Sequence, residues 1–162
     1  MKWILTLLLL ICLSSCKSKK STVLSKEEEK KEIEDRFTVL KIENEEELLL
    51  KQNRAISLGK RLLESCNNSK FTPFTTNEAT ETVIANATRE NITKTCQKIN
   101  QRNGKFIDIK LLETLKDNIN DEIIFRFDIL YEKKLFKREL KVIVNSENKV
   151  TSITTKEISK IF

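Results

Sequence analysis

The side chains with the most distinctive chemistry in this sequence are its four cysteines, Cys12, Cys16, Cys66 and Cys96. The chain of 162 residues contains no histidine, which excludes imidazole general bases, histidine-containing triads and histidine-ligated zinc sites. The chemistry open to the thiols is covalent modification, disulfide formation or burial as small apolar side chains. The segment that carries each cysteine decides among these.

Cys12 and Cys16 belong to an N-terminal segment typical of secreted proteins. Lys2 precedes an almost wholly apolar run over residues 4–13, and the chain becomes polar at Ser14. One positive charge followed by about ten apolar residues is the plan of a secretory signal peptide. A membrane-spanning helix would need about twenty apolar residues. We therefore predict that residues 1–15 are a signal peptide and that they do not form a permanent membrane span.

The residues at the end of this segment, Leu13-Ser14-Ser15-Cys16, resemble the lipobox of bacterial lipoproteins, in which an apolar and two small residues precede a cysteine. The resemblance implies that diacylglycerol is attached to the Cys16 sulfur, that the signal is cut before Cys16, and that the new amino group is acylated. Two or three acyl chains anchor a protein stably, since each buried methylene contributes about 0.8 kcal/mol. The alternatives are an uncleaved signal anchor and ordinary secretion with a chance cysteine.

The residues after Cys16 bear on where such a lipoprotein would reside. They are Lys-Ser-Lys-Lys-Ser, with no aspartate. By analogy with lipoprotein sorting, this predicts lipid attachment to the bacterial outer membrane rather than retention at the inner one. Lysines stand where surface-exported lipoproteins of some bacteria carry acidic residues, so we expect a body that faces the periplasm.

Cys66 and Cys96 would be the only thiols left in the mature chain. In an oxidising envelope they could pair, and closing a loop of thirty residues would stabilise the fold by about 3.7 kcal/mol in the chain-entropy model. Each also lies on an apolar helix stripe, where a free buried thiol is an ordinary small apolar side chain. A redox or metal site is a third alternative, with no C-x-x-C spacing to favour it.

The remaining sequence divides into a tether and one folded body. Residues 16–44 are highly charged and poor in apolar groups, which predicts a flexible tether after the lipidated cysteine. Residues 45–162 have the length and apolar content of a single domain. The chain has an excess of six positive charges, but no basic stripe interleaved with aromatic residues, so nucleic acid is not expected as a partner.

The first half of the body has the 3.6-residue period of helices. Asn44 and Glu47 can cap a helix of about twenty residues that ends at Asn67-Asn68-Ser69. A loop with Phe71 and Phe74 follows, and Thr75 with Glu78 forms a second capping box, which predicts a helix from there. Thr88 is expected to restart the helix, and Asn103-Gly104 to end it with glycine in a left-handed conformation.

The second half of the body has the two-residue period of strands. Strands are predicted over residues 106–115, 123–131, 136–144 and 150–155, joined by short polar turns. The second strand places one apolar set on a single face, namely Ile123, Phe125, Phe127, Ile129 and Tyr131. Helices first and a four-stranded antiparallel meander last predict an α+β fold.

This order resembles the nuclear transport factor 2-like, or cystatin-like, superfamily. The resemblance extends over about residues 45–158 and depends on Asn103-Gly104-Lys105-Phe106 entering the first strand and on Glu147-Asn148-Lys149-Val150 opening the last. It implies a cone in which a curled sheet wraps the helices and leaves an apolar pocket. The superfamily includes enzymes, ligand carriers and interaction modules, so it does not fix a function.

Two interpretations of a pocket follow from the residues. Phe125, Phe127 and Tyr131 could line it, although ordinary core packing explains the same stripe. An isomerase or dehydratase would need a carboxylate with a raised pKa opposite a hydrogen-bond donor. Asp108 is a candidate for the carboxylate and Tyr131 for the donor. We expect no catalytic residues, metal or cofactor.

The function expected from these observations is that of a membrane-anchored envelope lipoprotein. Its body would be a non-enzymatic module that binds an envelope protein partner or a small apolar ligand. The alternatives are an enzyme of the isomerase or dehydratase type and a structural component of envelope assembly.

Overall fold

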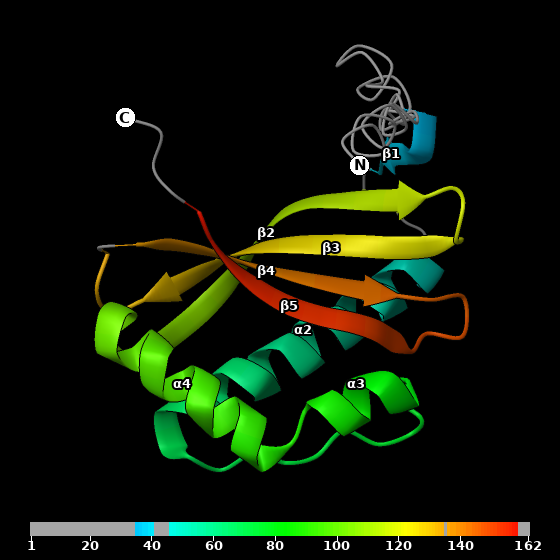
Figure 1. Cartoon of the computed structure of the whole chain (residues 1–162). Coiled ribbons are helices and arrows are strands. Elements are labelled where there is room, and N and C mark those ends of the chain that lie inside the picture. Colours follow the sequence, from blue (N-terminus) through cyan, green and yellow to red (C-terminus); the bar gives the residue numbers. More distant parts are fainter. Residues whose placement is uncertain (1–34, 41–45, 135, 159–162) are drawn as a thin grey trace, which may run out of the picture.

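The computed structural model describes residues 35–40, 46–134 and 136–158. The predicted signal peptide, Cys16 and most of the predicted tether lie outside them. The described elements are the helices α2 (Glu46–Asn68), α3 (Glu81–Asn86) and α4 (Arg89–Asn103) and the strands β1 (Phe37–Val39), β2 (Phe106–Asp117), β3 (Glu122–Tyr131), β4 (Lys137–Val144) and β5 (Val150–Ile158). The strands form one antiparallel sheet in the order β1-β2-β3-β4-β5, and the helices cover one of its faces (Figure 1). The predicted α+β class is confirmed.

The sheet has five strands, so the prediction of four was wrong. The additional strand, β1, lies within the predicted tether and pairs with the end of β2. Arg36 holds it there through an ion pair of 2.7 Å with the buried carboxylate of Asp117, and Asn118 donates its backbone N–H to the Arg36 carbonyl. A strand of three residues is too short to show a period. Its formation depends on partners about eighty residues away, which a local pattern does not reveal.

The predicted ends of two helices are confirmed. Helix α2 ends at Asn68, and Ser69 follows with a positive φ of 56°. Helix α4 begins after Thr88, whose side chain accepts a hydrogen bond from the Asn91 backbone N–H. It ends at Asn103 and is capped by Gly104, which has a φ of 75°. The predicted N-cap of the first helix, Asn44, lies outside the described residues.

The second helix begins later than predicted. Glu78 does accept hydrogen bonds from the backbone N–H and the hydroxyl of Thr75, but these close a turn, and α3 starts only at Glu81. The reason is tertiary, because Val150 in β5 exchanges two backbone hydrogen bonds with Glu78 and Thr80. Ala79 and Thr80 are thereby held extended and cannot enter a helix.

No helix among the described residues has the length and apolar character needed to cross a membrane.

The core lies between α2 and the middle of the sheet. The apolar face predicted for β3 is confirmed, since Ile123, Phe125, Phe127, Ile129 and Tyr131 are all buried. Gly59 lets α2 approach closely, because a Cβ atom there would lie 2.7 Å from a methyl carbon of Leu140 on β4. Two register shifts between β2 and β3 bend the sheet around this helix.

Candidate functional site

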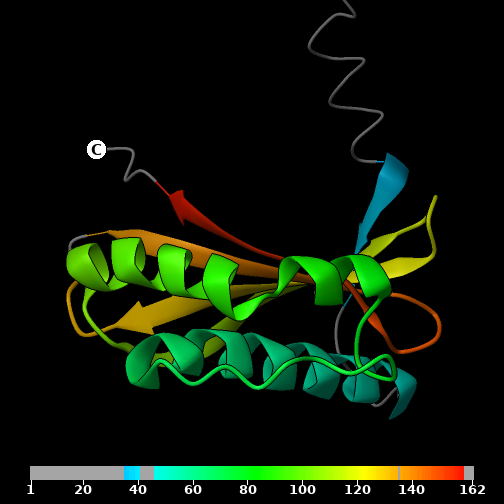
Figure 2. The same ribbon diagram turned by 60° about the horizontal axis from the view of Figure 1, so that its bottom comes forward.

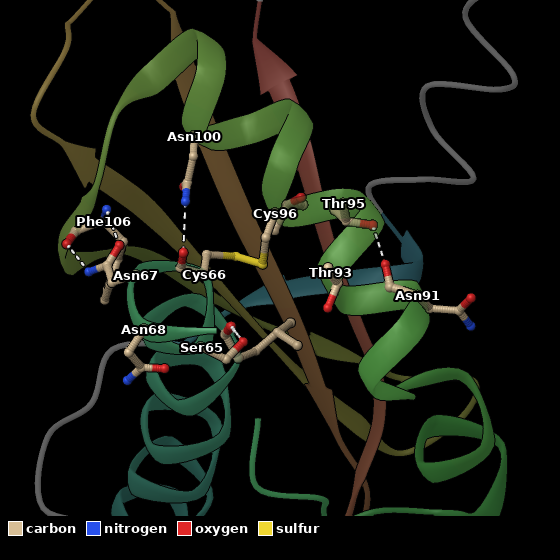
Figure 3. Close-up of a disulfide and its surroundings, with 12 residues drawn as sticks. Ser65, Cys66, Asn67, Asn68, Asn91, Thr93, Thr95, Cys96, Asn100 and Phe106 are labelled. Atoms are coloured by element: carbon tan, nitrogen blue, oxygen red, sulfur yellow. Dashed lines mark hydrogen bonds between the residues drawn. A yellow bond between two sulfur atoms is a disulfide. The ribbon is translucent and has the colours of Figure 1, made fainter. Parts of the chain in front are cut away.

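Two of the helices, α2 and α4, are joined by a covalent bond. Cys66 at the end of α2 and Cys96 in α4 form a disulfide with their Cα atoms 4.9 Å apart (Figure 3). Beside it, the side-chain amide of Asn100 donates a hydrogen bond of 2.7 Å to the Cys66 carbonyl. Among the alternatives that the sequence left open for these thiols, the structure contains the disulfide.

The end of α2 is also fixed to the sheet. The side chain of Asn67 donates to the Phe106 carbonyl at 2.8 Å and accepts from the Phe106 N–H at 2.9 Å, as Figure 3 shows. This reciprocal pair holds the last turn of α2 at the start of β2. Together with the disulfide, it sets the spacing between α2, α4 and the sheet.

That spacing leaves a groove between the helices and the last strand. The groove has a volume of about 390 Å³, within the range of small-molecule sites. Its lining comes from α2, α3, α4 and β5 and consists of Leu62, Leu63, Cys66, Thr82, Val83, Asn86, Ala87, Asn91, Ile92, Thr95, Cys96, Ile99 and residues 151–155. None of these side chains is charged. The floor is apolar, and the rim carries the exposed side chains of Thr82, Asn86, Asn91 and Thr95.

The groove runs along the edge of the sheet. Five consecutive residues of β5, from Thr151 to Thr155, line it. Successive side chains of a strand point to opposite faces, so a hollow on one face would be lined by alternate residues. Contact with five in a row therefore places the groove beside the strand, where the backbone of β5 forms one wall.

A smaller hollow lies on the other side of α4. It has a volume of about 230 Å³ and is lined partly by Ser69, Phe71, Arg89, Thr93 and Asn100. Both hollows include Cys66, Ile92 and Cys96 in their lining. The disulfide and Ile92 therefore form the partition between the two.

The three residues considered for a pocket lie elsewhere. Phe125, Phe127 and Tyr131 are 0%, 1% and 5% exposed and belong to the core cluster, and none of them lines either hollow. The rings of Phe125 and Phe127 stack with centroids 6.4 Å apart. Burial raises the pKa of Tyr131 to about 12. Core packing is thus the interpretation that the structure supports for this stripe.

The acid and donor considered for catalysis are not brought together in the groove. Asp108 forms an ion pair of 2.7 Å with Lys60 on α2 and accepts from the Ile109 N–H. The hydrogen bond from Lys60, followed by that from Ile109, lowers the pKa of the Asp108 carboxyl. An acid catalyst at neutral pH would need the opposite shift, and neither Asp108 nor Tyr131 lines the groove.

Comparisons with known proteins identified no relative of this chain. A scan against protein-family models found no match, and neither did searches of curated proteins and of solved structures. The groove must therefore be interpreted from its own residues.

The groove itself was missed by sequence reasoning, although one signal was present. Residues 151–155 read Thr-Ser-Ile-Thr-Thr, and the facing side of α4 carries Asn91 and Thr95. Short polar side chains on facing elements leave space that larger apolar side chains would fill. Without knowing that α4 faces β5, the sequence does not show that these residues meet.

Proposed function

We propose that this chain is a lipid-anchored envelope protein whose body is a non-enzymatic binding module, with the groove beside β5 as its binding site. The observation that carries the proposal is a groove of about 390 Å³ with an apolar floor, a polar rim and no charged side chain in its lining. Such a site suits an uncharged apolar group that is oriented by a few hydrogen bonds.

The anchor is supported by the sequence and by the compartment that the disulfide indicates. The lipobox-like residues ending at Cys16 assign the sulfur that would carry lipid. Disulfides persist in oxidising compartments such as the bacterial periplasm, so the Cys66–Cys96 bond favours an envelope location. Outer-membrane attachment with a periplasmic body, and membership of the nuclear transport factor 2-like superfamily, belong to the same proposal. The order of helices and curled sheet and the apolar hollow support the latter.

The enzymatic alternative lacks comparable support. No carboxylate lines the groove among the described residues, and the titratable groups considered for catalysis lie outside it. Binding is therefore the function that the geometry supports best.

The anchor is tested by replacing Cys16. In cells fed an alkyne analogue of palmitate, the wild-type chain should be labelled and should sediment with membranes. Cys16→Ser should abolish the labelling and retain the signal segment in the intact mass, whereas Cys12→Ser serves as the matched control and should behave as wild type. Labelling of the Cys16→Ser chain would contradict the proposed anchor.

The binding site is tested with a photoreactive apolar probe. An eight-carbon alkyl diazirine should crosslink to the full chain, purified in detergent, at residues of α4 and β5 that line the groove. Thr95→Trp fills the groove and should remove these crosslinks. Thr93→Trp is a matched control, since both threonines are exposed and both donate a hydrogen bond to the carbonyl four residues earlier on α4. Crosslinks spread over the whole surface, or unchanged by Thr95→Trp, would contradict the assignment.

A further inference from the structure

The strand beside the groove has an outer edge that is largely unpaired. β5 is the last strand of the sheet, and its ladder to β4 occupies only one edge. On the other edge Val150 alone has backbone partners within the described part of the chain, namely Glu78 and Thr80. An edge strand presents a row of N–H and C=O groups that can pair with another chain. Over residues 151–158, no other segment that the structure describes pairs with this row.

The chain itself shows that this edge accepts a strand. Residues 78–80 form a parallel bridge at Ala79 and Val150, with hydrogen bonds of 2.9 and 3.0 Å. The bridge occupies only the first residue of β5, and the chain then enters α3 at Glu81 and continues into α4 (Figure 2). The groove begins where this pairing stops, because its lining starts at Thr151. A ligand that continued the bridge would therefore lie in the groove.

A ligand in this position would contact both the backbone edge of β5 and the apolar floor of the groove. Its backbone would meet the free edge of β5, while side chains on its inner face would reach the apolar floor formed by Leu62, Ile99 and the disulfide. An acyl chain would use the floor but would leave the edge unpaired. Combined backbone pairing and alternate side-chain pockets are how extended peptides are bound at sheet edges.

Charged side chains of α4 and β5 lie near one end of the groove. Arg102 of α4 donates to Glu157 of β5 at 3.0 Å, so this side of α4 faces β5. Lys98 lies one helical turn before Arg102 on that side, and within the described residues Lys98 forms no ion pair. The lining itself is uncharged. An acidic group on a ligand is therefore favoured at the end of the groove near Lys98.

We propose that the groove binds a short extended peptide segment as an additional strand that runs parallel to β5. The segment has apolar side chains at alternate positions and a carboxylate at its C-terminal end, close to Lys98. The lining over Thr151 to Thr155 accommodates about five residues, or about 17 Å of extended chain. This inference depends on the proposed binding function and names the class of its partner.

The test begins with selection from a displayed library of random heptapeptides on the full chain, purified in detergent. Selected peptides should alternate apolar and other residues and should carry an acidic residue or free carboxylate at the C-terminal end. Two derivatives of the best peptide are then synthesised, one N-methylated at its odd and one at its even backbone amides. Because only alternate amides face β5, one derivative should bind at least about tenfold more weakly than the other, as measured by fluorescence anisotropy.

Variants of the chain locate the peptide. Thr95→Trp should weaken peptide binding at least about tenfold and Thr93→Trp by less than about twofold. Of these two threonines, Thr95 lines the groove and Thr93 lines the smaller hollow. Lys98→Gln should weaken binding about threefold to tenfold, with Lys94→Gln on the same helix as the matched control. Circular dichroism and melting curves should show that all four variants remain folded.

Two results would overturn the proposal of a bound peptide strand. Failure to select any peptide, or equal affinity of the two methylated derivatives, would exclude strand addition. If the alkyl probe still labelled the groove in that case, the proposed binding function would stand with a non-peptide ligand. If the probe labelling also failed, both proposals would fall together.

Discussion

The helical layer meets the sheet in two different ways. Over β2 to β4, α2 is packed directly on the strands through fully buried residues such as Ala55 and Leu58, with Gly59 in close contact with Leu140. We call α2 with these strands the packed half. Beside β5, α3 and α4 approach the sheet across a hollow of about 390 Å³, and we call these three elements the groove half.

The difference shows what keeps a hollow open in a small domain. In the packed half, large and small side chains interdigitate, and this close packing itself defines the distance between helix and sheet. In the groove half, the facing side of α4 carries Asn91 and Thr95, which are too short to fill the space. The distance is set instead by the disulfide and by the Asn100 hydrogen bond. A covalent tie thus supplements the packing of Ile92 and Ile99 where the hollow stays open.

The largest expected effect comes from the packed half. Phe127→Ala should lower the free energy of unfolding by about 3–5 kcal/mol, because the ring is 1% exposed and its loss leaves a cavity. Ile153→Ala in the groove half should cost about 1 kcal/mol, since Ile153 already borders open space. Urea unfolding followed by circular dichroism measures both. Equal losses would show that the hollow is packed in solution and that the two halves do not differ.

The next effect tests the covalent tie. Replacing both cysteines, Cys66→Ala with Cys96→Ala, should lower the free energy of unfolding by about 2–4 kcal/mol, since a bridge across thirty residues no longer restricts the unfolded chain. Amide hydrogen exchange should accelerate in α4 far more than in β3. Uniform acceleration in both elements would mean that the disulfide stabilises the whole fold rather than the groove half.

A smaller effect concerns the segment that occupies the start of the β5 edge. Glu78 is 16% exposed and pairs with Arg61, whose hydrogen bond holds the pKa of the carboxyl at about 2, against the opposing effect of burial. The pKa of this carboxyl is lower in the folded chain than its usual value near 4.5. The stabilisation that ionised Glu78 gives the fold is therefore complete above about pH 4.5 and disappears as the pH falls toward 2. Glu78→Gln should therefore cost about 1–2 kcal/mol at neutral pH.

The same substitution should have much less effect in acid. Unfolding measured between pH 7 and pH 2.5 should show the wild type and Glu78→Gln converging as the carboxyl is protonated. A constant difference across this range would exclude ionisation of Glu78 as the source of its contribution.

The smallest effect is expected at the surface of α4. Lys94 and Glu90 form an exposed ion pair four residues apart at 2.7 Å, and such pairs contribute about 0.3–0.5 kcal/mol. Lys94→Gln should therefore change the melting temperature very little, and the change should vanish in high salt. A large loss of stability would show that surface charges, rather than the disulfide, hold α4 in place.

The sequence by itself determined most of the local structure. The helical period predicted α2 and its end, Thr88 predicted the start of α4, and Gly104 predicted its end. The alternation along β3 predicted its core-facing side chains, although Ile124 on the opposite face is buried as well. These features depend on neighbours within a few residues, because capping, turn conformation and side-chain alternation are local consequences of backbone geometry.

Only the tertiary structure decided the fifth strand, the late start of α3 and the position of the groove. β1 depends on Arg36 and Asp117, which are eighty-one residues apart, and the extended backbone of Ala79 and Thr80 depends on Val150. The groove exists because α4, with its short polar side chains, lies opposite the edge of β5 at a distance set by the disulfide. Such contacts follow from how the elements pack in space, and that information is absent from any local stretch of the chain.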